Sequence, residues 1–193
     1  MKESYIQSFE EVINQHSSLS PDDFNVLLKL FTQKKYDSKA HIVNPNEDNS
    51  SVFFIISGLV RYYYLTSDGK EWNRAFLADN MMSTSFSQDA GKIEPYGIQA
   101  LEETKVLIAD FSEFQLLFDD SPMIERLHRK LVESILTKKM NRERSFLQNS
   151  AKLRYIDFVE QYPNVLRRIT QYHLASYLGV TEASLSRIIS EIH

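Results

Sequence analysis

The hydrophobic period of the chain changes once, and this change constrains the fold more than any other feature of the sequence. Between about residues 36 and 111, apolar residues occur in short runs rich in β-branched and aromatic side chains. From Ser121-Pro122 to about Leu147, apolar residues instead recur every three or four positions, without a Gly or a Pro. This period predicts one continuous helix, about 40 Å long at 1.5 Å per residue. The expected fold class is therefore α+β.

The first of these segments carries the turn signals of a small antiparallel β unit. Ser57-Gly58 ends one apolar run, Asp68-Gly69 gives a hairpin signal, and Glu102-Glu103 separates two further runs. Short strands at this spacing predict an antiparallel β-barrel or sandwich. Amphipathic segments at 3–16 and after Ser20-Pro21 predict flanking helices on the N-terminal side.

The apolar stripe of the long helix has two interpretations. It can bury the core of a single protomer, or it can pair with the same stripe of a second copy. We expect it to form a homodimer, and the residues expected to make the contact are Ile124, Leu127, Leu131 and Ile135. Because the period is the same in both cases, the sequence also allows this stripe to cover the β unit of its own protomer.

The strongest local signal lies near the C-terminus, in residues 169–189. Thr170 and Thr181 are candidate N-caps of two helices, and Gly179 can supply the positive φ of a tight turn between them. Ala175 is small enough for the second helix to cross the first closely. This order predicts a helix-turn-helix whose second helix enters the major groove of double-stranded DNA. A generic helical hairpin is the alternative.

The net charge of −4 hides an asymmetry along the chain. Residues 1–120 contain 10 Lys and Arg against 19 Asp and Glu, whereas residues 121–193 contain 12 against 7. The basic balance therefore lies in the part with the predicted helix-turn-helix, where it suits a polyanionic partner. Chance clustering of surface charge is the alternative.

Several classes of function are excluded by what the sequence lacks. The absence of Cys excludes disulfides, thiolate zinc sites, iron–sulfur clusters and a cysteine nucleophile, and it suits a cytoplasmic protein. No signal peptide and no apolar run of about 18 residues occurs, so we expect no membrane partner. No P-loop, dinucleotide fingerprint or nucleophile elbow occurs either. We expect neither an enzyme nor a bound metal or cofactor.

Several stretches resemble one known family. LASYLGVTEASLSRI resembles the helix-turn-helix of the cyclic-AMP receptor protein/FNR family of bacterial transcription regulators. FFIISGLVRYYYLTSDGKEW and GIQALEETKVLIADFSEF resemble strands of its barrel, and the Ser-Pro before the long helix resembles the start of its dimerisation helix.

The resemblance implies a fold and a set of partners. It implies a cyclic-nucleotide-binding-like, jelly-roll β-barrel with N-terminal helices at 1–120 and a dimerisation helix at 121–148. A helix-turn-helix domain with little or no wing would follow at 149–193. The resemblance also implies a homodimer that binds a roughly palindromic operator on double-stranded DNA, with RNA polymerase as a further partner.

The phosphate cassette of the nucleotide-binding members is degenerate in this chain. Those members use a Glu for the ribose and an Arg-Ser pair for the cyclic phosphate. Here Ser85 stands in place of the Glu, Glu94-Pro95 stands in place of the Arg-Ser pair, and no Arg lies between Arg74 and Arg126. We therefore expect that cyclic nucleotides do not bind.

The sequence does not identify an effector. A pocket for one would lie between the barrel and the long helix, and its expected walls are Tyr63, Ser83, Thr84, Ser85, Phe86 and Tyr96. The alternative is that these side chains simply fill the barrel core. A small-molecule sensor with an unidentified ligand in this pocket is the alternative function.

The family motif also assigns DNA contacts, residue by residue. It implies base contacts for Glu182, Ser184 and Arg187, and phosphate contacts for Thr170, Gln171 and Thr181. Arg187 could pair with guanine through two hydrogen bonds. Arg167 and Arg168 precede the first helix and are either further phosphate contacts or a solvated pair.

Overall fold

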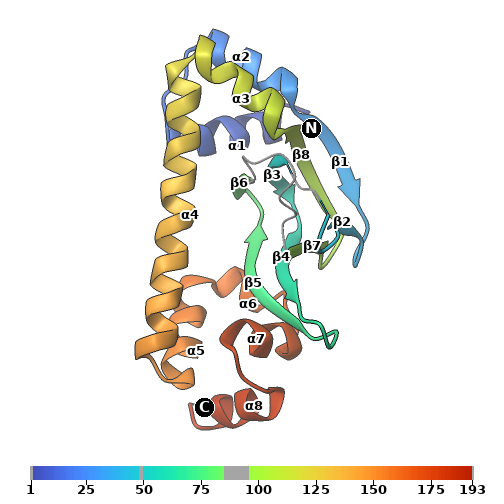
Figure 1. Ribbon diagram of the computed structural model, residues 1–193, viewed down its shortest axis with the longest axis vertical. Helices are drawn as coiled ribbons and strands as arrows, with labels where there is room; N and C mark the ends of the chain where they lie inside the picture. The colour runs from blue at the N-terminus through green and yellow to red at the C-terminus, as the bar shows by residue number, and fades with distance from the viewer. Residues whose placement is uncertain (1, 48–49, 85–95, 193) are drawn as a thin grey trace.

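The computed structural model describes residues 2–47, 50–84 and 96–192, with helices and strands in the order expected of an α+β chain (Figure 1). The helices are α1 Lys2–Asn14, α2 Pro21–Leu30, α3 Phe111–Asp120, α4 Pro122–Gln148, α5 Ala151–Gln161, α6 Pro163–Leu166, α7 Gln171–Leu178 and α8 Glu182–Ser190. The strands are β1 Thr32–Tyr36, β2 His41–Val43, β3 Ser51–Ser57, β4 Leu59–Leu65, β5 Glu71–Ala78, β6 Met82–Thr84, β7 Tyr96–Ala100 and β8 Thr104–Asp110. The α+β class is thereby confirmed.

The described strands form two four-stranded antiparallel sheets. One has the order β1-β8-β3-β6 and the other the order β2-β7-β4-β5. The closed barrel that the resemblance implied is not formed by these strands, because the end strands of each sheet pair with one neighbour only. The β unit is therefore a sandwich, the second arrangement that the strand spacing allowed.

Gly58 explains why consecutive strands separate into two sheets. It is the single residue between β3 and β4, and its φ is +117°. A Cβ at this position would lie 2.5 Å from Thr104 Oγ1. The chain therefore turns sharply here, so that β3 pairs with β8 while β4 pairs with β7.

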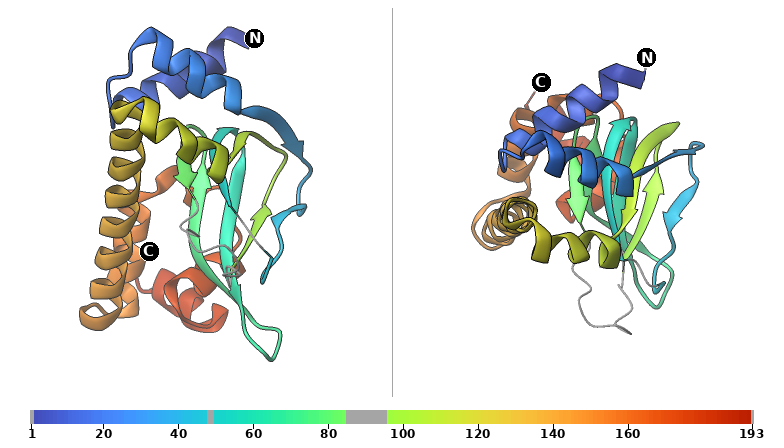
Figure 2. Two further views of the ribbon diagram at one scale, coloured as in Figure 1. Left: turned by 45° about the horizontal axis from the view of Figure 1, so that its top comes forward. Right: turned by 90° about the horizontal axis from the view of Figure 1, so that it is seen from above.

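The sandwich has an apolar interior and a second core on one outer face. Phe53, Ile55 and Val106 point between the two sheets, whereas the alternate residues Phe54 and Leu107 point outward. Helices α1, α2 and α3 and the first half of α4 cover this outer face, and they lie across one end of the strands (Figure 2).

The first half of α4 packs inside the protomer. Ile124, Leu127 and Leu131 are at most 3% exposed and belong to the core beneath α1–α3. Ile135 is half-buried and lines a cavity described below. Ile124, Leu127 and Leu131 therefore contact the core of their own protomer, which is the other interpretation that the stripe allowed, whereas Ile135 stays a predicted dimer contact. The exposed large apolar residues of α4 lie further along, at Leu136, Met140, Phe146 and Leu147.

The C-terminal helices share a third core with the second sheet. Phe158 of α5, Leu174 and Leu178 of α7 and Leu185 of α8 pack with Leu59 and Phe76 in a single cluster, and these residues are all buried. Helices α5–α8 thus gather at the end of the sandwich opposite α1–α3 (Figure 1). Helices α7 and α8, which carry the predicted helix-turn-helix, therefore share a core with the second sheet.

Candidate functional site

Helices α7 and α8 form a compact pair joined by a tight turn. The Thr170 side chain accepts a hydrogen bond from the His173 N–H at the start of α7, and Thr181 accepts one from Ser184 at the start of α8. Gly179 ends α7 in the left-handed conformation, with φ +69°. The two predicted caps and the predicted positive φ are confirmed, and they arise from local sequence alone.

The position of Gly179 is restricted by a second contact. A Cβ at this residue would lie 2.7 Å from a ring carbon of Phe146, which belongs to α4. Both the backbone conformation and the space therefore require Gly, and the turn between α7 and α8 is fixed against the long helix.

The outer face of α8 carries few side chains that can reach a partner. Glu182, Ser186 and Arg187 are exposed, while Leu185 is buried against α7. Ser184 is half-buried, and its hydroxyl lies 2.9 Å from the Thr181 hydroxyl, so it is engaged in the cap. Of the three residues to which the family motif assigns base contacts, Glu182 and Arg187 face outward, while Ser184 is half-buried with its hydroxyl in the cap. Ser186 is an outward-facing residue that the motif did not point to.

The residues implied to contact phosphate also lie at the surface. Thr170, Gln171 and Thr181 are exposed at the starts of α7 and α8. Their main-chain N–H groups belong to the first turns of these helices, where anions are favourably placed. Tyr172 is a further exposed group on the first turn of α7.

Arg167 and Arg168 have different roles although they are adjacent. Arg167 is exposed, whereas Arg168 forms ion pairs with Asp79 and Glu102. Glu102 raises the pKa of Arg168 by hydrogen bonding to it. The guanidinium of Arg168 thus joins the helix pair to two turns of the sandwich, so Arg168 is not the solvated side chain that the sequence also allowed. Its partners are 66 and 89 residues away, so no local pattern could have found them.

Helix α7 is docked on β5 through polar groups. The Ser176 hydroxyl accepts a hydrogen bond from the Asn73 N–H at 2.8 Å and donates to the Glu71 carbonyl at 3.1 Å. The Asn73 side chain donates to the His173 carbonyl at 2.9 Å. Strand β5 pairs with β4 alone, so main-chain groups on its other side need partners from elsewhere. The Ser176 hydroxyl of α7 supplies a partner for two of these groups.

A buried arginine connects this contact to the sheet. Arg61 of β4 is 3% exposed, and it donates to Asn73, Gln99 and the Glu71 carboxylate. Burial lowers the pKa of His173 to about 4, and the charge of Arg61 lowers it in the same direction. His173 is therefore neutral near pH 7.

The predicted effector-pocket residues are only partly brought together. Ser83, Thr84 and Tyr96 line one cavity, whereas Tyr63 lies on the other face of β4. The Tyr63 ring packs where a Cβ of Gly97 would stand, and its hydroxyl lies 3.2 Å from His41 Nε2. Tyr62, one position earlier, lines the cavity in its place, because successive side chains of a strand alternate between faces. Ser85 and Phe86 lie outside the described residues.

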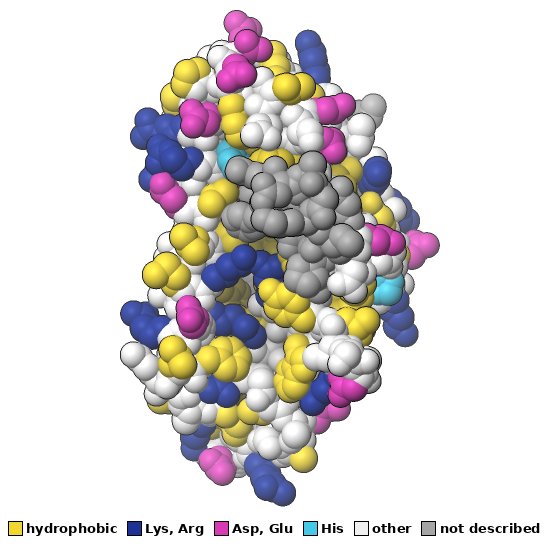
Figure 3. Space-filling view, in the orientation of Figure 1, with side chains coloured by type: hydrophobic (Ala, Val, Ile, Leu, Met, Phe, Trp, Pro, Cys, Tyr) yellow, Lys and Arg dark blue, Asp and Glu magenta, His cyan; other side chains and the backbone are white. Residues whose placement is uncertain are grey.

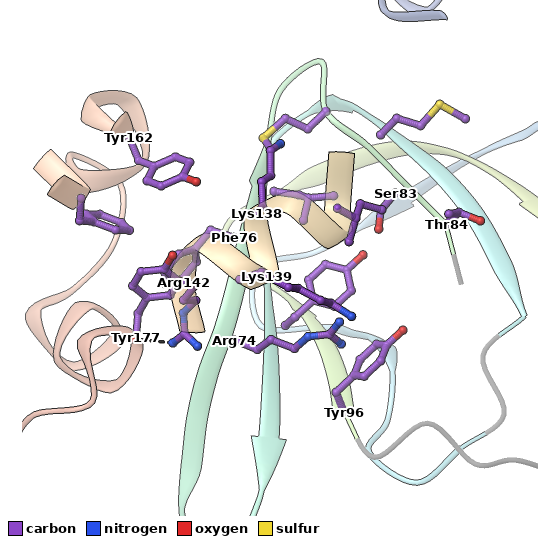
Figure 4. A pocket seen from close by; sticks show the side chains of 17 residues that line it. Arg74, Phe76, Ser83, Thr84, Tyr96, Lys138, Lys139, Arg142, Tyr162 and Tyr177 are labelled. Atoms are coloured by element: carbon purple, nitrogen blue, oxygen red, sulfur yellow. Dashed lines mark hydrogen bonds between the residues drawn. The ribbon is translucent and has the colours of Figure 1, made fainter. Parts of the chain in front are cut away.

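The cavity lies where the sandwich, α4 and the C-terminal helices meet. It has a volume of about 130 Å³, and its walls come from β4–β7, from the second half of α4 and from α5 and α7 (Figure 4). In the space-filling view, Lys and Arg side chains lie above and below a hollow beside α4, and hydrophobic side chains flank it (Figure 3). Sequence reasoning missed Arg74 and Arg142, because it searched for an Arg only at the cassette position.

Comparisons with known proteins agree on the fold. FixK2 from Bradyrhizobium japonicum is 20% identical over 84% of each chain, with a TM-score of 0.74. A double variant of CooA from Carboxydothermus hydrogenoformans is 24% identical over 86% of this chain and 78% of that one, with a TM-score of 0.69. A transcriptional regulator of the Crp/Fnr family from Eubacterium rectale is 18% identical over 90% and 83%, with a TM-score of 0.71. The chain has the Crp/Fnr fold.

The Crp/Fnr fold spans most of this chain, and it agrees with the resemblance drawn from the sequence. No family sequence model and no curated protein sequence matches the chain. The role of each part of the fold is therefore argued from the residues of this chain.

Two further findings concern the described residues only. None of their helices is both long enough and apolar enough to cross a lipid bilayer. Within the same residues, no three His, Asp or Glu side chains lie close enough together to hold a metal ion.

Proposed function

We propose that this chain is a sequence-specific DNA-binding transcription regulator of the Crp/Fnr type. In this proposal α7 and α8 are a helix-turn-helix, and α8 enters the major groove. One observation carries it: a turn restricted by Gly179 holds α8 against α7 with Glu182, Ser186 and Arg187 on the open side.

The proposal assigns separate tasks to these side chains. Arg187 reads a guanine through two hydrogen bonds, and Glu182 accepts from a cytosine amino group or stabilises the start of α8. Ser184 positions the start of α8 through the cap and contacts DNA from there. Thr170, Gln171 and Thr181 contact phosphates together with the exposed Arg167.

The division of the chain into parts follows from these tasks. Residues 1–120 form the effector domain, residues 121–148 the dimerisation helix and residues 149–193 the DNA-binding domain. We propose a homodimer that binds two half-sites about one turn of DNA apart, and that contacts RNA polymerase there. The exposed apolar residues Leu136, Met140 and Leu147 of α4 support this dimer, because they lie on one side of the helix outside the protomer core.

A small-molecule sensor is the second candidate function, and the cavity between the sandwich and α4 favours it. The two candidates are compatible, since a ligand there would contact elements on both sides of the junction. Cyclic nucleotides are not proposed as this ligand, because Ser85 and Glu94-Pro95 occupy the cassette positions in the sequence.

The test is selection of bound DNA by the purified chain from a random-sequence library. We expect one enriched, roughly palindromic motif, with affinity that falls steeply as salt rises. Arg187→Ala should relax the preference at one base position of each half-site by about tenfold or more. Arg126→Ala, on the exposed face of α4 far from α8, is the matched control and should leave the motif unchanged. Selection of no motif, or unchanged selectivity in Arg187→Ala, would overturn the assignment of α8.

A further inference from the structure

The described walls of the cavity at the junction include several basic groups and no acidic one. Arg74, Lys138, Lys139 and Arg142 line it, and none of the other described lining residues is an Asp or a Glu. The sandwich contributes Arg74, while the second half of α4 contributes the other three (Figure 4). Positive charge in a partly enclosed space favours an anion.

A β-bulge places Arg74 in this cavity. On β5, Asn73 is opposite Tyr63 and Ala75 is opposite Tyr62, so Arg74 has no opposite residue on β4. Bulges redirect a side chain locally, and they are frequent next to functional sites. The Arg74 guanidinium lies 4.5 Å from the centre of the Tyr96 ring, and among the described residues no carboxylate forms an ion pair with it. Within the part of the chain that the structure describes, its N–H groups therefore face no carboxylate.

Arg142 faces the same cavity with one donor unused. Its Nη2 donates to the carbonyls of Asn73 and Tyr177, which belong to the sandwich and to α7. Its Nε–H is buried and has no acceptor among the described groups. Burial lowers the pKa of Arg142, and the nearby charge of Arg74 lowers it further. An anion between the two guanidinium groups would relieve both this repulsion and the missing hydrogen bond.

The Tyr62 hydroxyl is a second buried polar group without a partner. Tyr62 is 5% exposed, and its hydroxyl faces Ser83 without reaching the distance and angle of an ordinary hydrogen bond to any described group. Burial raises the pKa of Tyr62, so the hydroxyl keeps its proton near neutral pH and is a donor. Buried polar groups are nearly always hydrogen-bonded, so two such groups on the α4 and β4 walls of one cavity indicate a ligand that accepts hydrogen bonds.

The remaining walls and the volume define the body of that ligand. The apolar lining comes from Phe76, Leu77, Met81, Met82, Ile135 and Phe158. A volume of about 130 Å³ is close to that of the engineered apolar cavity, about 150 Å³, that binds benzene.

We propose that this cavity binds a small carboxylic acid with a compact apolar body, of about the size of benzoate. The carboxylate lies between Arg74 and Arg142 and accepts a hydrogen bond from the Tyr62 hydroxyl, and the body packs among the apolar walls. Because Arg142 also holds the Tyr177 carbonyl of α7, the bound acid would bias the position of the reading helices. This last consequence rests on the proposed function.

The test is calorimetry on the full chain without DNA, using benzoate, benzyl alcohol, inorganic phosphate and cyclic AMP as separate probes. We expect benzoate to bind, benzyl alcohol to bind at least about tenfold more weakly, and the other two not to bind. Benzyl alcohol keeps the ring but lacks the charge, so it isolates the contribution of the carboxylate. No benzoate binding, or equal binding of benzyl alcohol, would overturn the proposal.

Three variants test the residues. Tyr62→Phe and Arg74→Gln should each weaken benzoate binding by about tenfold, while Arg126→Gln, an exposed residue of α4, should leave it unchanged. Tyr62→Phe should not lower the melting temperature, because it removes a buried group without a partner. A lower melting temperature with unchanged benzoate affinity would show a purely structural hydroxyl, contrary to the proposal.

A binding assay with the selected DNA separates this proposal from the proposed function. If DNA is selected and benzoate does not bind, the cavity proposal fails and the DNA-binding function stands. If benzoate binds and no DNA is selected, the reverse holds. If both bind and benzoate leaves DNA affinity unchanged, the acid is a ligand but the bias on the reading helices is refuted.

Discussion

Asn73 joins the sandwich to α7 through both its main chain and its side chain. Its N–H donates to Ser176, its Nδ2 donates to the His173 carbonyl, and its Oδ1 accepts from Arg61. Asn73 is buried, so each of these bonds replaces a hydrogen bond to water. A change in the charge of a neighbouring group, such as protonation of His173, should therefore change the stability of this contact.

The first prediction concerns the pH dependence of His173. Its folded pKa of about 4 lies below the value of about 6.5 expected for an unfolded chain. The resulting stability is complete above pH 6.5 and is lost as the pH falls from 6.5 toward 4, because the unfolded state binds the proton first. We expect the urea midpoint of the wild type to fall more than that of His173→Gln between pH 7.5 and pH 5. A His173 pKa near 6.5 by NMR would contradict this prediction.

The second prediction concerns Gly179, where both strain and space restrict the residue. Gly179→Ala should destabilise the chain by more than the roughly 1–2 kcal/mol that the left-handed conformation alone costs, because the new Cβ meets Phe146. Gly69→Ala is the matched control, since Gly69 has φ +81° and nothing within 4 Å of its Cβ. Denaturation should give a larger loss at Gly179, and equal losses would refute the role of the Phe146 contact.

What the sequence predicts at this scale depends on how local the cause is. The caps at Thr170 and Thr181 and the turn at Gly179 were predictable, because each involves residues within a few positions. Tyr63 was placed on the wrong face because strand alternation can be read only once a register is known. Arg168 could not be assigned from sequence, since its partners Asp79 and Glu102 are brought near it by the fold.

At the scale of elements, α4 is divided by what covers it. Its first half is buried by α1–α3 and the sandwich, whereas its second half lines the cavity and exposes apolar groups. The sequence has one continuous helical period across both halves, so it predicted the helix but not the change of partner. The same limit applies to α7. Its docking on β5 depends on hydrogen bonds between Ser176 and main-chain groups of β5, which no sequence pattern predicts.

The third prediction compares the neighbours Arg167 and Arg168. Arg168→Ala should lower stability by about 0.5–1 kcal/mol, since its partners are partly exposed. It should leave the salt dependence of DNA binding unchanged. Arg167→Ala should do the opposite and reduce the slope of log affinity against log salt by about 1. Thermal unfolding and salt titrations check both variants, and a reduced slope in Arg168→Ala would show that Arg168 contacts phosphate.

At the scale of the whole molecule, the sequence predicted the class of fold and the order of its parts. The closed barrel that the resemblance implied was wrong, since the described strands form two separate sheets. The strands, the long helix and the terminal helix pair follow from period and turn residues. The separation of β3 and β4 into two sheets depends on contacts between Gly58 and Thr104, which are distant in the sequence. The shared core of Leu59, Phe76 and the C-terminal helices is likewise a property of the assembled chain.

The last prediction concerns the proposed homodimer. Leu136 and Met140 are 53% and 59% exposed on the second half of α4, so replacing both with Glu should leave the protomer folded while placing charge in the proposed interface. We expect the wild type to sediment as a dimer and the double variant as a monomer. The double variant should also lose most of its affinity for a two-half-site operator while retaining its affinity for a single half-site. Leu116→Glu, at an apolar residue of α3 that is 71% exposed, is the control and should remain dimeric. A wild-type monomer, or a double variant that stays dimeric, would place the interface elsewhere.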